Sequence, residues 1–90
     1  MSIGSIIETT PGICGGHARL AGTRIPVHRI ARYHQLGFAP EEVLGLLNSL
    51  SLSQIYAALT HALANPQEIE SALREEEDAA RHLSREQQPA

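Results

Sequence analysis

Signals that start helices recur at short intervals along this sequence, and they constrain its fold more than any other feature. Pro26, Pro40 and Pro66 each precede apolar residues with helical spacing, and proline is favoured in the first turn of a helix. Ser51-Leu-Ser-Gln54 is a capping box, in which the serine and the glutamine satisfy each other's backbone amides. We therefore predict four helices, over residues 26–36, 40–48, from 52 onward, and from 66 to about 83.

Apolar spacing predicts which face of each helix is buried. For the first helix the inward set is Val27, Ile30, Ala31 and His34, and the outward set is His28, Arg29, Arg32 and Gln35. For the third helix the inward set is Leu52, Ile55, Tyr56, Leu59 and Leu63, and the outward set is Ser53, Gln54, Ala57, Thr60 and His61. Asn65 is expected to cap the fourth helix, whose sparse apolar stripe holds it only weakly to the rest.

The N-terminal segment carries the signals of a small β-hairpin. Residues 6–9 are rich in β-branched side chains, and Gly15-Gly16 can take the positive φ angles of a tight turn. Because an isolated two-stranded hairpin is marginally stable in water, this arm is expected to pair with the body of the chain or with a second copy. Pairing between copies would make a homodimer.

Composition points to a single small domain without catalytic machinery. At 90 residues the chain can bury only a modest core, built from aliphatic residues because aromatic residues make up 3%. Cys14 is the single cysteine, and the five histidines show no spacing typical of a metal or catalytic site. We therefore predict no enzymatic activity, cofactor, metal or small-molecule substrate. The lack of an export signal or a membrane-spanning apolar run predicts a cytoplasmic location and no membrane partner.

Charge is distributed unevenly along the chain, whose net charge is −3. Residues 9–40 hold four arginines, three histidines and no acid, whereas residues 66–90 hold seven acids against three arginines. Such blocks are typical of a chain with two partners of different character, although an acidic run is also typical of a solvated helix. Both explanations of the acidic end stay open at this point.

The second and third helices, joined by a turn at Asn48-Ser-Leu50, have the arrangement of a helix-turn-helix. Operator DNA is therefore a candidate partner, with arginines contacting phosphates and the third helix reading bases. The candidate DNA-binding residues are Arg19, Arg24, Arg29, Arg32, Ser53, Gln54 and His61. The third helix exposes no arginine or lysine, so its base reading would be weak. Arg24 could instead hold the N-terminal turn through backbone carbonyls.

Part of the sequence also resembles a known family. The stretch over residues 11–27, followed by Leu36-Gly37, Pro40-Glu-Glu42 and Tyr56-Ala-Ala-Leu59, is similar to domain-of-unknown-function family 433 (DUF433). Gly22-Thr-Arg-Ile-Pro-Val27 is its most specific part. Members of that family are similar to VapB-type antitoxins with a helix-turn-helix or winged-helix-like fold. Together with the elements predicted above, this gives a mainly α fold, with a short N-terminal β-hairpin arm, a helix-turn-helix or winged-helix-like three-helix core and a C-terminal helix.

The resemblance further implies the antitoxin of a type II toxin–antitoxin system, which neutralises a PIN-like ribonuclease toxin and autoregulates its operon. Residues 1–65 would then bind DNA and dimerise, and residues 66–90 would bind the toxin. The candidate toxin-binding residues are Ile69, Leu73, Arg74, Arg81, Leu83 and Arg85. Apolar residues would enter a groove of the toxin and arginines would pair with its carboxylates. Arg74 and Arg81 could equally pair with Glu70 and Glu77, four residues before them.

Two other functions remain compatible with the same residues. A stand-alone helix-turn-helix transcriptional regulator would have no toxin partner, and its acidic end would be a solvated helix. A pure toxin inhibitor would bind the nuclease without reading DNA, which suits the uncharged third helix.

Overall fold

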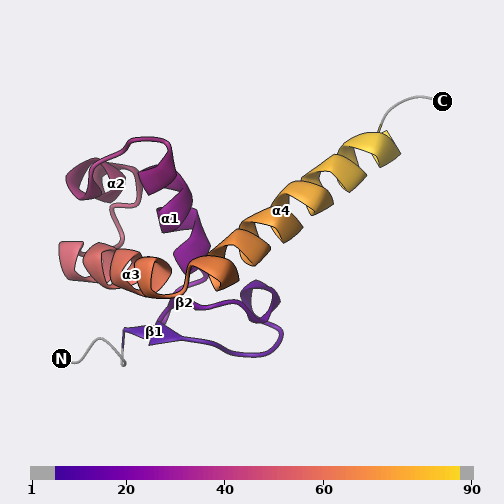
Figure 1. The fold of residues 1–90 in the computed structure, drawn as a ribbon. Helices are drawn as coiled ribbons and strands as arrows, with labels where there is room; N and C mark the ends of the chain where they lie inside the picture. Colours follow the sequence, from indigo (N-terminus) through magenta and orange to yellow (C-terminus); the bar gives the residue numbers. More distant parts are fainter. Residues whose placement is uncertain (1–5, 88–90) are drawn as a thin grey trace.

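A short antiparallel hairpin precedes four helices in the part of the chain that the structure describes (Figure 1). This computed structural model describes residues 6–87, with side chains as far as residue 82. The elements are β1 (Ile7–Glu8), the 3-10 turn η2 (Cys14–Gly16), β2 (Arg19–Leu20), α1 (Val27–Gln35), α2 (Pro40–Leu46), α3 (Leu52–Ala64) and α4 (Pro66–Gln87). The predicted mainly α fold with an N-terminal hairpin and a C-terminal helix is confirmed.

Local hydrogen bonds set the helix ends. At the start of α3, Gln54 N–H donates to Ser51 Oγ at 3.3 Å and Ser51 N–H donates to Gln54 Oε1 at 2.7 Å, which confirms the capping box. At the end of α1, Gly37 adopts a φ of 96° and Phe38 N–H donates back to the Tyr33 carbonyl at 3.0 Å. A positive φ at this position suits glycine, because it has no Cβ to clash with the preceding turn.

The junction between α3 and α4 differs from the prediction. The Asn65 side-chain Nδ2 donates to the His61 carbonyl at 2.9 Å, so this side chain caps the C-terminus of α3. The Asn65 backbone carbonyl accepts from Ile69 N–H at 3.2 Å and so belongs to the first turn of α4. The last carbonyls of a helix need donors, which an amide group can supply. Asn65 therefore takes part in the end of α3 and in the start of α4, which begins at the next residue.

One hydrophobic core joins the hairpin to all four helices. Its buried apolar residues are Ile6, Ala18, Leu20, Val27, Ile30, Ala31, Val43, Leu50, Ile55, Ala57, Ala58, Ala62, Ile69 and Leu73. The rings of Tyr33 and Phe38 pack edge to face beside it, with centroids 5.6 Å apart. The core extends across the expected division at residue 65, because α4 contributes to it.

The hairpin is held against the body of the same chain. β1 pairs with one edge of β2. On the other edge, Leu20 N–H donates to the Ile25 carbonyl at 3.0 Å and Val27 N–H donates to the Ala18 carbonyl at 2.9 Å. The connection between the strands is a long loop containing η2, where the sequence predicted a tight two-residue turn. Of the two pairing partners expected for the hairpin, the structure shows the chain's own body.

Side-chain burial corrects two of the predicted helix faces. On α1, His28 is buried and His34 is exposed, the reverse of the prediction. On α3, Tyr56 and Leu63 are exposed while Ala57 is buried. Small side chains allow close packing between helices, so alanines occupy much of the buried face of α3. The largest apolar residues of that helix are not all directed inward.

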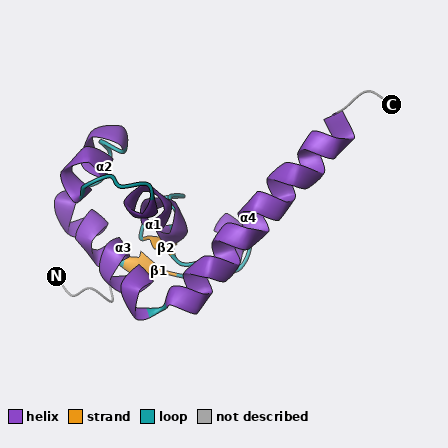
Figure 2. Ribbon diagram, turned by 45° about the horizontal axis from the view of Figure 1, so that its top comes forward, coloured by secondary structure: helices purple, strands orange, loops and turns teal. Residues whose placement is uncertain are grey.

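α4 leaves the body after its first turns (Figure 2). Ile69, Ala72 and Leu73 are buried, whereas every residue from Arg74 to His82 is exposed. Figure 1 shows this orange-to-yellow part of α4 extending away from the other helices. A helix segment with so little buried apolar surface gains little stability from tertiary packing.

We predict that Leu73→Ala lowers the free energy of unfolding by about 2–4 kcal/mol, because it empties a buried site where α4 meets the core. Leu63→Ala is the matched control, since this leucine is 72% exposed, and it should cost less than about 0.5 kcal/mol. Chemical denaturation of the full chain, followed by circular dichroism, measures both values. Equal costs would show that α4 does not dock on the core.

Candidate functional site

Basic side chains from the η2 loop, from the connection between β2 and α1, and from α1 lie on the side of the body that faces α4. We call this set, which consists of His17, Arg24, His28, Arg29 and Arg32, the basic face. We call the three consecutive glutamates at positions 75–77 of α4 the acidic turn. His28 and Arg32 are four residues apart on α1, so their side chains lie on the same side of that helix.

Two glutamates of the acidic turn pair with two histidines of the basic face. Glu75 Oε2 lies 2.6 Å from His17 Nε2, and Glu76 Oε2 lies 3.0 Å from His28 Nε2. The two imidazole rings meet edge to face with centroids 5.4 Å apart. Two histidines and two carboxylates thus form a single cluster between the loop and α4.

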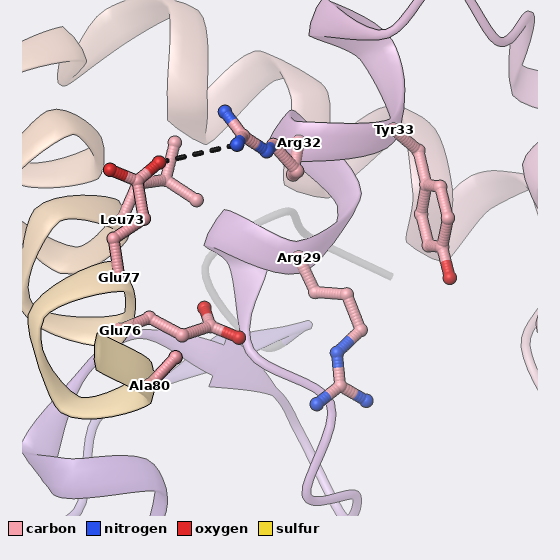
Figure 3. A pocket seen from close by; sticks show the side chains of 7 residues that line it. All are labelled: Arg29, Arg32, Tyr33, Leu73, Glu76, Glu77 and Ala80. Atoms are coloured by element: carbon pink, nitrogen blue, oxygen red, sulfur yellow. Dashed lines mark hydrogen bonds and ion pairs between the residues drawn. The ribbon is translucent and has the colours of Figure 1, made fainter. Parts of the chain in front are cut away.

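The third glutamate reaches an arginine across the groove between α1 and α4 (Figure 3). Glu77 Oε1 accepts from Arg32 Nη2 at 3.2 Å, and the pair spans a groove of about 310 Å³. Arg29 lines the same groove, but its guanidinium points away from this pair. Leu73 and Ala80 complete the α4 wall. The groove therefore combines an apolar wall with charged rims.

A second hollow, of about 410 Å³, lies between the η2 loop and α4. Arg29 and Glu76 line both hollows, so the two form one continuous surface. Arg24 lines the second hollow, and its backbone carbonyl accepts from Cys14 Sγ at 3.2 Å. Cys14 has a φ of 52°, which is unusual for a residue other than glycine. This sharply turned loop brings His17 to α4.

Burial lowers the pKa of His28 below its ordinary value of 6.5. The carboxylate of Glu76 opposes this shift by favouring the charged imidazolium, while the positive charges of His17 and Arg29 reinforce it. The side chain is nearly enclosed, with 7% of the residue exposed. The folded chain therefore favours neutral His28.

Arg19, a candidate for phosphate contact, is buried and holds the hairpin together. Its Nη2 lies 2.7 Å from Glu8 Oε2 and donates to Thr10 Oγ1 at 3.0 Å, and its Nη1 donates to the Thr23 carbonyl at 3.1 Å. With 6% of the residue exposed, the guanidinium is closed off from an external phosphate. The sequence suggested Arg24 for this clamping role, and the structure gives it to Arg19.

The three candidate base-reading residues of α3 already have local polar partners. Ser53 Oγ lies 2.9 Å from Ser51 Oγ, and the Gln54 side chain closes the capping box. His61 Nε2 lies 3.0 Å from Glu68 Oε2 on α4. The seven candidate DNA-binding residues thus separate into a buried clamp, three arginines of the basic face and three locally bonded residues of α3.

The candidate toxin-binding residues also divide into a buried apolar group and an exposed charged group. Ile69 and Leu73 are buried in this chain's own core, because they lie where α4 docks on the body. In this arrangement their apolar surface is already covered and is not presented to a groove on another protein. They anchor α4 instead.

The arginines of α4 remain at its surface. Arg74 and Arg81 are exposed. Arg81 pairs with Asp78, three residues before it, at 2.5 Å, while the Glu77 expected for it pairs with α1. Leu83 and Arg85 belong to α4, but their side chains lie outside the described residues.

The sequence does not single out the acidic turn, His17 or His28 as site residues. The available signal is the division of charge into a basic block and an acidic block. Such blocks are typical of surfaces for different partners, and the acidic one is equally typical of a solvated helix. The structure shows that they also pair with each other across the fold.

Neither a metal-holding cluster nor a membrane-spanning helix is found among the described residues, 6–87. Within that range, no group of three or more histidine, cysteine, aspartate and glutamate side chains is arranged to hold a metal ion. Across the same described residues, α4 and the shorter helices all lack the length and apolar character needed to cross a bilayer.

The chain is similar to one protein family over most of its folded body. Residues 7–62 match the family described as "Protein of unknown function (DUF433)". The crystal structure of a DUF433 member protein from Anabaena variabilis ATCC 29413 is similar at 37% sequence identity, with a TM-score of 0.70. The match covers 74% of this chain and 66% of that one, slightly less than two thirds of that protein's length. No curated protein matches the sequence significantly.

We predict that His28 makes the chain less stable as the pH falls through about 6.5. Since its pKa is lower in the folded chain, the unfolded chain binds more protons in this range, and stability is lost on acidification. His28→Gln should flatten this pH dependence of the unfolding free energy. His34→Gln, at an exposed position of the same helix, is the control. Parallel pH profiles for wild type and His28→Gln would contradict the assignment.

We predict that Arg19→Ala lowers the unfolding free energy by about 2–4 kcal/mol, because it removes a buried charge and leaves its hydrogen-bond partners unsatisfied. Arg24→Ala removes an exposed arginine from the same segment and should cost less than about 0.5 kcal/mol. Urea titration distinguishes the two. A negligible cost for Arg19→Ala would refute the clamp.

Proposed function

The chain belongs to the DUF433 family, and from that premise we propose that it is the antitoxin of a type II toxin–antitoxin pair. In this proposal α4 binds and neutralises a PIN-like ribonuclease, while the body binds operator DNA as a homodimer and represses the operon. The resemblance to VapB-type antitoxins supplies the kind of partner. The exposed outer part of α4 is the observation that carries the proposal.

The outer part of α4 has the properties of a helix that a partner completes. Every residue from Arg74 to His82 is exposed, although the glutamates at 75–77 pair with the body, and the far end of the helix extends beyond the body. A polar helix of this kind packs little of its own surface, and such segments commonly become ordered against another protein. Its inner end is fixed by Ile69 and Leu73, so the segment is held out in a defined direction.

The exposed arginines of α4 suit an acidic nuclease site. PIN-like nucleases gather carboxylates around a divalent metal, and an arginine can pair with two carboxylate oxygens at once. Arg81 is 68% exposed and pairs only with the similarly exposed Asp78 among the described contacts, so it can exchange this partner at little cost. Arg74 lies two turns earlier and is also exposed. Arg85 and Leu83 extend the proposed contact along the same helix.

Three arginines of the basic face suit DNA phosphates. Arg24, Arg29 and Arg32 are exposed and lie around two adjoining hollows. Arginine contacts with phosphate give affinity that depends strongly on salt and weakly on sequence. A homodimer would double these contacts and so strengthen operator binding.

A nuclease inhibitor that reads no operator is the second candidate. The local hydrogen bonds of Ser53, Gln54 and His61 favour it, because these side chains would have to exchange partners before reading bases. A mobility-shift assay with DNA from the chain's own promoter, against an unrelated duplex of equal length, separates the two functions. Preferential retardation of the promoter DNA supports the repressor.

We predict that the full chain retains a co-expressed PIN-like nuclease, encoded by a neighbouring gene, in a pull-down. A chain that ends after Ala79 keeps Ile69 and Leu73, so it should fold but lose most of this retention. Arg81→Glu should weaken binding at least about tenfold, because it places a carboxylate against the acidic site. Arg29→Glu, on the body, should leave nuclease binding unchanged.

Thermal melting of the shortened chain provides the control for folding. Retention of the nuclease by the shortened chain would exclude the outer part of α4 as the docking segment. Failure of the full chain to retain the nuclease would reject the antitoxin proposal itself.

A further inference from the structure

The acidic turn occupies the surface that a polyanion would use. The basic face forms a continuous strip, since Arg29 lines both the groove beside Arg32 and the hollow beside Arg24. Glu76 also lines both, and Glu75 and Glu77 pair at either side of it. Carboxylates of α4 therefore lie along the length of the strip.

The three pairs are close enough to block an incoming anion, and the Arg32–Glu77 pair, with both side chains about half exposed, is open enough to be exchanged. The glutamate side chains are 52–68% exposed, although each reaches a cation or imidazole within 3.2 Å. A solvent-exposed ion pair such as Arg32–Glu77 is weak, because water and salt screen it. Phosphate oxygens and carboxylate oxygens accept the same charge-assisted hydrogen bonds from arginine and protonated histidine. An anion that binds Arg32 must first replace Glu77.

We propose that the acidic turn of α4 is a built-in competitor for nucleic-acid phosphate on the basic face, so that a molecule which draws this turn away raises the chain's affinity for nucleic acid. The inference rests on the proposed function for the kind of polyanion and for α4 as the helix that a partner binds. It adds that the two binding events are linked through the fold. A partner docked on α4 uncovers the basic face, and nucleic acid bound on that face displaces α4.

Two glutamates of α4 that differ in position and pairing allow this competition to be separated from a general effect of net charge. Glu70 lies on the same helix as Glu77, two turns earlier, and it lines a different hollow, formed by α1, α3 and α4. Neutralising either glutamate changes the net charge by the same amount. Of these two glutamates, Glu77 is the one that contacts Arg32, so its removal should free an arginine and the removal of Glu70 should not.

The test is fluorescence anisotropy of a short labelled DNA duplex of arbitrary sequence, titrated with the full chain at low salt. We predict that Glu77→Gln binds about two- to fivefold more tightly than wild type, the range expected from releasing one exposed pair. The slope of the logarithm of its affinity against the logarithm of the salt concentration should steepen by about the amount expected for one additional phosphate contact. Glu70→Gln should bind like wild type.

A double-mutant cycle makes the test specific to the pair. In an Arg32→Ala background, Glu77→Gln should bring no further gain, because the arginine that it would release is missing. An equal gain for Glu77→Gln and Glu70→Gln, or a gain that persists without Arg32, would overturn the inference. Absence of duplex binding by wild type and Glu77→Gln alike would also overturn it. Nuclease retention by the full chain is measured independently of this duplex, so the proposed antitoxin function can stand if the competition fails.

Discussion

The docking of the first turns of α4 on the core governs the rest of this structure. Ile69, Ala72 and Leu73 are buried there, and the glutamates at 75–77 follow within one turn. Because a helix is nearly straight and rises by about 1.5 Å per residue, the anchor also fixes where these glutamates lie. The ion pairs with the basic face are individually weak. Apolar burial brings them together, and they then link the helix to the η2 loop and α1.

The arginines and histidines of the basic block take two different roles. Arg19 is buried in the hairpin region, where three neighbouring residues accept hydrogen bonds from its guanidinium. Arg24, Arg29 and Arg32 remain at the surface. Under the proposed function, this division places the electrostatic attraction for DNA on α1 and the loop before it, while α3 adds little charge. Nucleic-acid affinity would then depend more on phosphate contacts than on base reading.

The sequence predicts the helices well because their starts depend on neighbouring residues. The capping box at Ser51 acts through hydrogen bonds within four residues, and proline at a helix start acts through its own fixed φ angle. A short stretch of sequence is therefore enough to locate these helix starts. Burial was harder to predict, because it depends on what packs opposite. His28 is enclosed by the loop and α4, and Leu63 is exposed although its spacing suits a core position. For the candidate site, the arginines could be named from the sequence, whereas their partners could not.

Short stretches of sequence are enough to predict the four helices, a β-hairpin near the N-terminus, and the separation of charge into a basic and an acidic block. They do not predict the connection inside the hairpin, which is a long loop in place of the expected tight turn. Packing between distant segments fixes three further features: the hairpin pairs with its own body, Arg19 is a clamp, and the acidic block lies against the basic one. These outcomes join residues as far apart as Arg32 and Glu77. Such contacts depend on how the helices pack around a shared core, and no short segment of sequence specifies that packing.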